Sequence, residues 1–345
     1  MRKLHLTTYG LVSCFLLPAA RTQSSIQEDQ THLRMNVVLV QLSIAVTDSK
    51  GNYVNGLHPE DFEVVEDNIP QKISSFEEGN GSGGTGNPSN PANSDDIPRS
   101  EVSEGERQAQ SVPVVEPANS ESRGTQASVF VLFDTSNYMY RGFVFAQDAI
   151  ADFIRSMDSP GKIAFYSYCR DLSRAMQLTS DHFRILDAVR STVAGDDAAL
   201  YNSLLLTVKD AAPLKGRKAI VVFSNGPDNA SSVPPEDVAE LAQSTGTIIY
   251  IISTRQAEED PASAAAFERM SKVSGGKAYF AKNWLDEKKA FASIREDLIH
   301  LYSVSYYPQA NPNRGWRSIK VRLVGKNLQK YHVRTRDGYR LAAQR

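Results

Sequence analysis

Hydrophobic and polar positions divide the chain into three kinds of pattern. Residues 36–46 are rich in β-branched residues, and short apolar runs joined by Asn, Asp and Pro turns follow as far as residue 77. From residue 126 to 301, continuous apolar runs alternate with segments that have apolar residues at helical spacing. From residue 302 to 345, apolar and polar residues alternate, as in half-buried antiparallel strands. The patterns predict a β segment, an α/β segment and a second β segment.

The central segment, 126–301, predicts an α/β domain with a doubly wound, mostly parallel sheet. Residues 129–133, 218–223 and 247–252 are apolar at nearly every position, as in parallel strands that are buried on both faces. Helical segments lie between these runs, so we expect helices on both faces of the sheet. Residues 175–178 predict a short edge strand.

The outer segments predict an accessory antiparallel β module. Residues 36–77 are too few to bury an independent core. The strands predicted within 302–345 would supply the missing partners. We therefore expect the N-terminal and C-terminal segments to pair with each other, although no single residue signals this pairing.

Residues 78–125 predict a flexible acidic linker. The segment is rich in Gly, Asn, Pro, Ser and Glu, has almost no large apolar residue, and carries eight acidic against three basic residues. Such a composition buries too little apolar surface to offset the entropy of ordering the chain.

The first residues, 1–24, predict an export signal. Arg2 and Lys3 precede the apolar run 11–17, and small residues follow. The run is too short to span a bilayer, which takes roughly 20 apolar residues, and no other segment resembles a transmembrane helix. The predicted location is therefore secreted, periplasmic or at the cell envelope.

Two ways of processing this signal stay open. Ordinary cleavage would fall near Ala20 or Ser24, after the small residues. Cleavage before Cys14, in the manner of a lipoprotein, would leave a lipid anchor on that residue. The apolar run continues past Cys14, which favours ordinary cleavage.

Composition and motifs speak against catalysis and against nucleic acid as a partner. The net charge is −2, which produces no long-range field for a polyanion. The six histidines are scattered, and neither a G-x-S-x-G nor a phosphate-binding glycine loop occurs. Once Cys14 has left with the signal or carries lipid, Cys169 has no intrachain partner, and we interpret it as an inert thiol. An enzyme is not expected.

Several segments together resemble the von Willebrand factor type A domain, and more narrowly the VWFA-related family of secreted acidobacterial proteins. VFVLFDTSNYMY (129–140) stands where the family has D-x-S-x-S. GDDAALYNSL (195–204) resembles the loop G-G-T-A-L-Y-D-A-L, and AIVVFSNGPDN (219–229) resembles an apolar strand that ends in S/T-D-G-x-D-N. Residues 46–76 and 302–323 resemble the N-terminal module and the tail of the narrower family.

The resemblance implies an Mg²⁺ site that this chain has largely lost. The family binds the ion through an Asp, two hydroxyls, a distant Thr and a second Asp. Asp134 and Ser136 match this set, whereas Tyr138, Ala198 and Asn225 replace the other three. We expect a degenerate site without a cofactor.

A rebuilt Mg²⁺ site stays open as an alternative. Three carboxylates stand beside the lost ligands and supply the oxygens that Mg²⁺ prefers: Asp196, Asp197 and Asp228.

The predicted function is that of a secreted, non-catalytic adhesion or scaffolding protein that binds a protein partner. Parallel sheets bind ligands beyond the carboxyl ends of their strands, which points to the loops after Phe133 and Phe223. Recognition would be independent of metal. The residues predicted to contact the partner are Tyr138, Met139, Tyr140, Arg141 and Asn225.

The alternative prediction is an anion-binding module of the envelope that acts through the basic C-terminal strands. Between Arg314 and Arg345 there are ten Lys and Arg and one acidic residue, Asp337. Lys320 and Arg322 share one face of a predicted strand and would meet an anionic polysaccharide there.

Overall fold

The computed structural model describes residues 39–79, 127–157, 161–254 and 259–341. The predicted export signal, Cys14 and the predicted linker from residue 80 onward lie outside these ranges. The described residues form a six-stranded sheet with helices and two four-stranded sheets.

The six-stranded sheet has the strand order β10-β9-β8-β5-β6-β7. Adjacent strands in this sheet are parallel to each other except for β6 and β7, which pair antiparallel. The predicted doubly wound, mostly parallel sheet with an edge strand is therefore confirmed. The strands are β5 (Ser128–Asp134), β6 (Lys162–Tyr168), β7 (Leu172–Thr179), β8 (Lys218–Ser224), β9 (Thr247–Ser253) and β10 (Ala278–Phe280).

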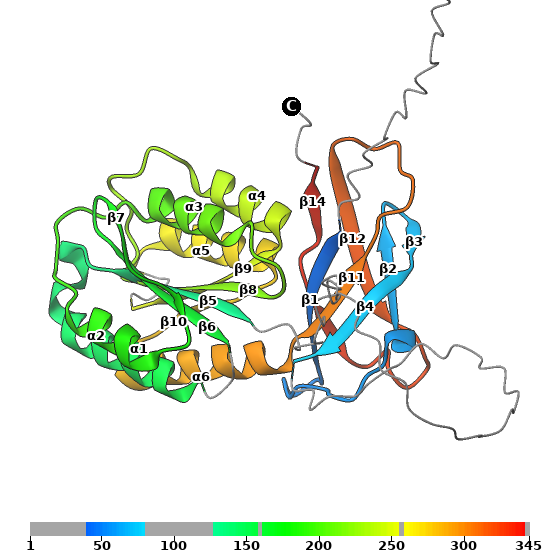
Figure 1. Cartoon of the computed structure of the whole chain (residues 1–345), viewed down its shortest axis with the longest axis horizontal. Helices are drawn as coiled ribbons and strands as arrows, with labels where there is room; N and C mark the ends of the chain where they lie inside the picture. Colours follow the sequence, from blue (N-terminus) through cyan, green and yellow to red (C-terminus); the bar gives the residue numbers. More distant parts are fainter. Residues whose placement is uncertain (1–38, 80–126, 158–160, 255–258, 342–345) are drawn as a thin grey trace, which may run out of the picture. The chain divides into compact units, whose positions relative to one another are not determined.

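Helices cover both faces of this sheet (Figure 1). Alternate residues of β5 point to opposite faces, so Phe133 packs against one group of helices and Leu132 against the other. The first group is α1 (Phe143–Ser156), α2 (His182–Arg190) and α6 (Trp284–His300). The second group is α3 (Leu200–Ala211), α4 (Pro235–Thr245) and α5 (Pro261–Ser274).

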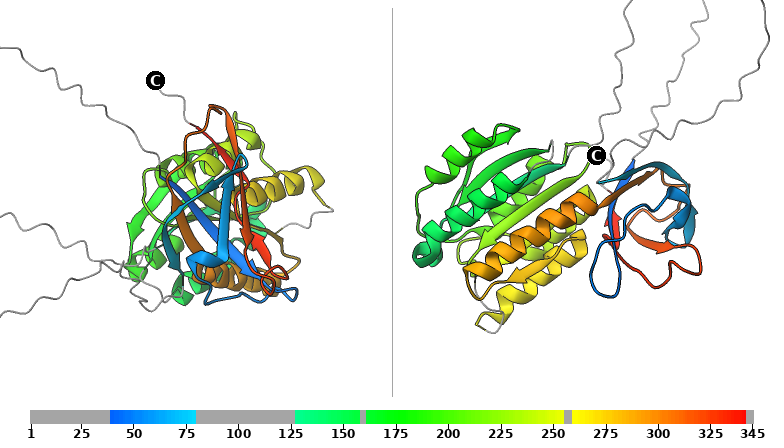
Figure 2. Two further views of the ribbon diagram at one scale, coloured as in Figure 1. Left: turned by 90° about the vertical axis from the view of Figure 1, so that its right-hand side faces the viewer. Right: turned by 90° about the horizontal axis from the view of Figure 1, so that it is seen from below.

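The two four-stranded sheets form the antiparallel module. Their strand orders are β13-β1-β11-β4 and β14-β12-β2-β3. The predicted pairing of the N- and C-terminal segments is confirmed, since β11 lies between β1 and β4 and β12 pairs with β2. Figure 2 shows these blue and cyan strands beside the orange and red ones. Their bounds are β1 (Val40–Thr47), β2 (Phe62–Glu66), β3 (Ile69–Gln71), β4 (Ile73–Glu78), β11 (Tyr302–Tyr306), β12 (Trp316–Leu323), β13 (His332–Arg334) and β14 (Gly338–Arg340).

Both sheets of the module contribute to one apolar core, which contains a buried ion pair. Leu42 and Val304 from one sheet and Val64 and Ile319 from the other belong to this core. At its border, the buried Glu66 accepts a hydrogen bond from Arg317 Nη1 at 2.8 Å.

Two tyrosines also donate hydrogen bonds to Glu66. The hydroxyls of Tyr306 and Tyr339 donate to its Oε2 at 2.8 and 3.0 Å. A buried charge is tolerated only when it is paired and hydrogen-bonded, and this carboxylate is both.

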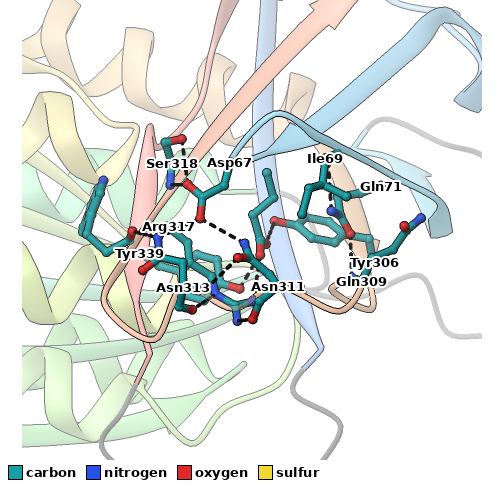
Figure 3. A network of polar contacts seen from close by, with 12 residues as sticks. Asp67, Ile69, Gln71, Tyr306, Gln309, Asn311, Asn313, Arg317, Ser318 and Tyr339 are labelled. Carbon is teal, nitrogen blue, oxygen red and sulfur yellow. Dashed lines mark hydrogen bonds and ion pairs between the residues drawn. The ribbon is translucent and has the colours of Figure 1, made fainter.

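Asp67 organises the neighbouring turn (Figure 3). Its carboxylate accepts hydrogen bonds from Asn311 and Asn313 at 3.0 and 2.8 Å and from the Ser318 amide at 2.9 Å. Burial opposes the charge, but these donors outweigh it and lower the pKa of Asp67 to about 2. The turn between β2 and β3 is thereby tied to the segment that leads into β12.

A second buried carboxylate, Asp297 on α6, joins the module to the α/β segment. It accepts hydrogen bonds from the hydroxyls of Tyr53 and Tyr250, each at 2.7 Å, and from the guanidinium of Arg334. Tyr53 and Arg334 come from the outer segments of the chain, whereas Tyr250 lies on β9. Asp297 is fully buried, so its charge depends on these three partners.

The buried Lys218 makes stability depend on pH. Burial, aided by Arg336, lowers the pKa of its ammonium to about 8 from 10.5. The folded protein therefore releases this proton before the unfolded chain does, so the free energy of unfolding should gain a rising contribution between about pH 8 and 10.5. Urea unfolding from pH 7 to 9.5 should show a rise that Lys218→Met removes. The exposed-lysine variant Lys215→Met should keep the wild-type slope, and a rise that survives in Lys218→Met would contradict this assignment.

Candidate functional site

Loops from four elements meet at the carboxyl edge of the six-stranded sheet. A 3-10 turn, Asn137–Gly142, follows β5 and leads into α1. The loops after β8 and β9 end at the same edge because these strands are parallel to β5. The N-terminus of α6 joins them, with Asn283 as its cap, which accepts hydrogen bonds from the amides of residues 285 and 286.

Asp134 ends β5 and is buried beneath this edge. Its Oδ1 accepts a hydrogen bond from the Ser136 amide at 2.9 Å, and its Oδ2 accepts one from Ser224 Oγ at 2.7 Å. Tyr168 donates in turn to Ser224 Oγ at 3.1 Å. Burial raises the pKa of Asp134, against the hydrogen bonds that favour its charge. Both carboxylate oxygens are therefore engaged inside the protein.

The other positions of the family's metal motif hold few oxygen ligands. Ser136 Oγ is buried and has no hydrogen-bond partner among the described residues, as is expected of a metal ligand without its ion. Ala198 is buried and has no side-chain oxygen. Asn225 directs its amide nitrogen to the backbone carbonyl of Tyr138, so it links two loops.

The neighbouring carboxylates are engaged elsewhere or exposed. Asp228 caps the start of α3 by accepting from the Tyr201 amide at 2.8 Å, and its other oxygen accepts from the Ser231 amide. Asp197 pairs with Arg170. Asp196 has an exposed side chain.

This donor set does not fit Mg²⁺. The ion takes about six oxygens at 2.0–2.1 Å, usually with one or two carboxylates among them. Asp134 is the anionic motif residue that remains, and its oxygens already accept hydrogen bonds from Ser136 and Ser224. In the part of the chain that the structure describes, no three His, Cys, Asp or Glu side chains form a group suited to a metal.

A cleft of about 620 Å³ opens at the same edge. Three large aromatic side chains at the cleft are mostly exposed: Tyr140 to 77%, Phe145 to 67% and Trp284 to 60%. Soluble proteins rarely gather exposed aromatics in one place without a binding role. The residues that line the cleft are Asn137, Tyr138, Met139, Tyr140, Gly142, Phe145, Asn225, Thr254, Asn283, Trp284 and Glu287.

The structure brings four of the five predicted contact residues to this cleft. Tyr138 and Asn225 are half-buried in its wall, and Tyr140 is exposed. Met139 also reaches the wall but is only 2% exposed and packs in the apolar core, so it supplies little contact area. Its spacing along the 3-10 turn directs it inward, which the sequence pattern did not reveal. The side chain of Arg141 lies outside what the structure describes.

The other half of the cleft was not predicted. Phe145 follows the helical spacing of α1, yet it lies on the exposed side of that helix. Trp284 and Glu287 come from α6, about 150 residues after Asp134 in the chain. The sequence feature that could have located this half of the cleft is Trp284, directly after the helix cap Asn283. A Trp that is exposed in the first turn of a helix does not pack in a core.

The arginines of the basic C-terminal strands are largely paired within the protein. Arg317 pairs with Glu66, Arg322 with Glu63, and Arg334 with Asp297. Arg322 stays exposed on the strand face that it shares with Lys320, but Glu63 balances part of the charge that was predicted to meet an anion there. The described strands therefore present less free positive charge than their composition suggests.

The fold and this edge define a doubly wound α/β domain with a cleft at the carboxyl edge of its sheet. A family model for the von Willebrand factor type A domain matches residues 128–293. These residues are a von Willebrand factor type A domain, as the motifs predicted. The narrower resemblance to the acidobacterial family stays a prediction.

Solved structures of low sequence identity are similar to this chain. A von Willebrand factor type A structure from Catenulispora acidiphila is 10% identical, with a TM-score of 0.42 and coverage of 62% of this chain and 66% of that one. An aerotolerance-related membrane protein from Bacteroides fragilis is 17% identical, with a TM-score of 0.43 and coverage of 50% and 98%. The von Willebrand factor domain of the pilus tip protein Mfa5 from Porphyromonas gingivalis is 12% identical, with a TM-score of 0.41 and coverage of 50% and 94%.

No curated protein matches the sequence. Among the described residues, no helix combines the length and the apolar character needed to cross a membrane.

Proposed function

We propose that this chain is an exported, non-catalytic binding protein that holds a protein partner in the cleft at the carboxyl edge of its von Willebrand factor type A domain. The observation that carries the proposal is the gathering of exposed Tyr140, Phe145 and Trp284 at that edge. Aromatic side chains of this kind are the anchors that dominate binding energy at protein interfaces. Export rests on the sequence of residues 1–24.

Recognition by this cleft is proposed to be independent of metal. An Mg²⁺ ion bound as in the family would have to displace the hydrogen bonds of Asp134. It would also lack three of its ligands, at the positions of Tyr138, Ala198 and Asn225. The aromatic wall offers apolar contact area that needs no ion. Titration of Mg²⁺ or Mn²⁺ into the full chain should give no saturable heat. Saturable binding that disappears in Asp134→Ala would contradict metal independence.

The absence of catalysis is proposed from the chemistry of the cleft wall. A nucleophile needs a base within hydrogen-bond reach. The residues that line the cleft include one carboxylate, Glu287, and one aliphatic hydroxyl, that of Thr254, which donates to the sulfur of Met139 at 3.9 Å rather than to a base. Cys169 lies in a different hollow, near β6 and β7.

Loss of the aromatic wall should abolish partner capture. Full-length protein, immobilised and exposed to an extract of the producing cell's envelope proteins, should retain a protein that Phe145→Ala or Trp284→Ala reduces by at least about tenfold, as expected for interface anchors. The matched control is Phe183→Ala, which removes an equally exposed phenylalanine (82%) on α2, away from the cleft.

Capture should also be unchanged by a chelator such as EDTA. Equal loss in Phe145→Ala and Phe183→Ala would mean that exposed apolar surface in general, rather than the cleft, retained the protein. No loss in either cleft variant would overturn the proposed function.

A further inference from the structure

Glu287 lines the cleft together with the aromatic residues and has no charged partner among the described residues. It is half-buried and lies in the first turns of α6, one helical turn after Trp284. No described residue donates a hydrogen bond or an ion pair to its carboxylate. Burial raises its pKa, as expected for a carboxylate that lacks a compensating donor.

The neighbouring charged residues of α6 have partners of opposite charge. Asp286 accepts from Lys289 at 3.4 Å. Lys288 pairs with Asp152 of α1 at 3.2 Å, and its ammonium lies 5.4 Å from the centroid of the Trp284 ring. This distance is an ordinary one for a cation–π contact, so the Trp284 ring has the electrostatic character that attracts a cation. Glu287 is left as the unbalanced charge of the cleft wall among the described residues.

Aromatic faces beside a free carboxylate form a site for a cation. The negative face of an aromatic ring attracts an ammonium or guanidinium group, and the attraction grows when water is excluded. A carboxylate adds a charge-assisted hydrogen bond, which is stronger than a neutral one. An acidic ligand would instead meet like charge at Glu287 and would gain nothing from the rings.

We infer that the cleft receives a lysine or arginine side chain of the protein partner, held between Tyr140, Phe145 and Trp284 with its charge on Glu287. This inference rests on the proposed function and names the chemistry of its partner.

Short peptides of known charge test the inference directly. The probes are Ac-Gly-Lys-Gly-Lys-Gly-NH₂, its arginine counterpart and its glutamate counterpart, titrated into the full-length protein at pH 7 and followed by calorimetry. A basic peptide should bind, the glutamate peptide should not, and Glu287→Gln should weaken binding roughly tenfold, in line with the strength of a charged hydrogen bond. Trp284→Ala should weaken it by a similar factor.

The matched control is Glu60→Gln, the same chemical change at an exposed position of the module. It removes one negative charge from the protein but leaves the cleft intact, so it should bind the basic peptides as the wild type does. Equal weakening in Glu60→Gln and Glu287→Gln would mean that net charge alone attracts the peptides and would overturn the inference. Circular dichroism and melting temperature check that each variant is folded.

The remaining outcomes separate this inference from the proposed function. Absence of binding by both basic peptides, or tighter binding of the glutamate peptide, would overturn the cation site. If Phe145→Ala still abolished partner capture while Glu287→Gln left it unchanged, the cleft would be the binding site but its ligand would be apolar. If neither variant affected capture, the proposed function itself would fail.

Discussion

Asp297→Asn should lower the free energy of unfolding by roughly 3–5 kcal/mol, the usual cost of leaving one member of a buried ion pair without its partner. The substitution preserves the shape of the side chain but removes the charge that Arg334, Tyr53 and Tyr250 surround. The melting temperature should fall by roughly 10 °C, since about 2–4 °C corresponds to 1 kcal/mol in a protein of this size. Differential scanning calorimetry of the full chain measures the effect.

An exposed ion pair supplies the control for this prediction. Glu236→Gln removes the partner of Arg269 in a solvent-exposed pair and should cost less than about 1 kcal/mol. The double variant Asp297→Leu with Arg334→Met should recover part of the loss, because apolar residues often replace a buried pair without harm. A loss below 1 kcal/mol in Asp297→Asn would mean that Arg334 finds solvent or another partner.

Arg317→Met should destabilise the β module by a similar amount, roughly 3–5 kcal/mol, because it removes the guanidinium that is hydrogen-bonded to the buried carboxylate of Glu66. Tyr306 and Tyr339 would still donate to that carboxylate, but neutral hydroxyls do not balance its charge. Urea unfolding followed by Trp fluorescence and by circular dichroism should both report the loss.

The same substitution on the same strand gives the matched control. Arg322 lies on β12, as Arg317 does, but its partner Glu63 and the guanidinium are both accessible to solvent. Arg322→Met should therefore cost less than about 1 kcal/mol. Equal losses in the two variants would show that apolar packing of β12, rather than burial of charge, controls the stability of the module.

The central sheet could be predicted from sequence because burial on both faces leaves an unambiguous pattern. Residues 129–133, 218–223 and 247–252 are apolar at nearly every position, and they lie in β5, β8 and β9. Asp181 caps α2 for a local reason, because its side chain accepts a hydrogen bond from the amide of Arg184, three residues along the chain. Such signals depend on neighbours in the sequence.

The strand order of the module was beyond local patterns. Residues 36–77 are too few to bury a core alone, and this predicted that they pair with the C-terminal segment. Which strand lies next to which depends on contacts between residues more than 200 positions apart, such as Tyr302 and Ile44. The short strand β14 (Gly338–Arg340) carries no alternation to detect over its three residues.

The candidate site, too, was predictable from the sequence only in part. The loops after Phe133 and Phe223 were located correctly at one edge, because the carboxyl ends of parallel strands lie together. The inward turn of Met139 and the outward position of Phe145 depend on how the 3-10 turn meets α1, which spacing alone does not reveal. Trp284 and Glu287 reach the cleft only through the path of α6.

Because β11 lies between β1 and β4, this sheet of the β module cannot form until β11 has been synthesised. The β1 and β4 strands leave the ribosome early, yet each pairs with β11, which is made only after the whole type A domain. Until then both strands have unpaired edges and an uncovered apolar face, the condition in which strands join other chains. A product truncated before Tyr302 should therefore aggregate even if its type A domain is folded.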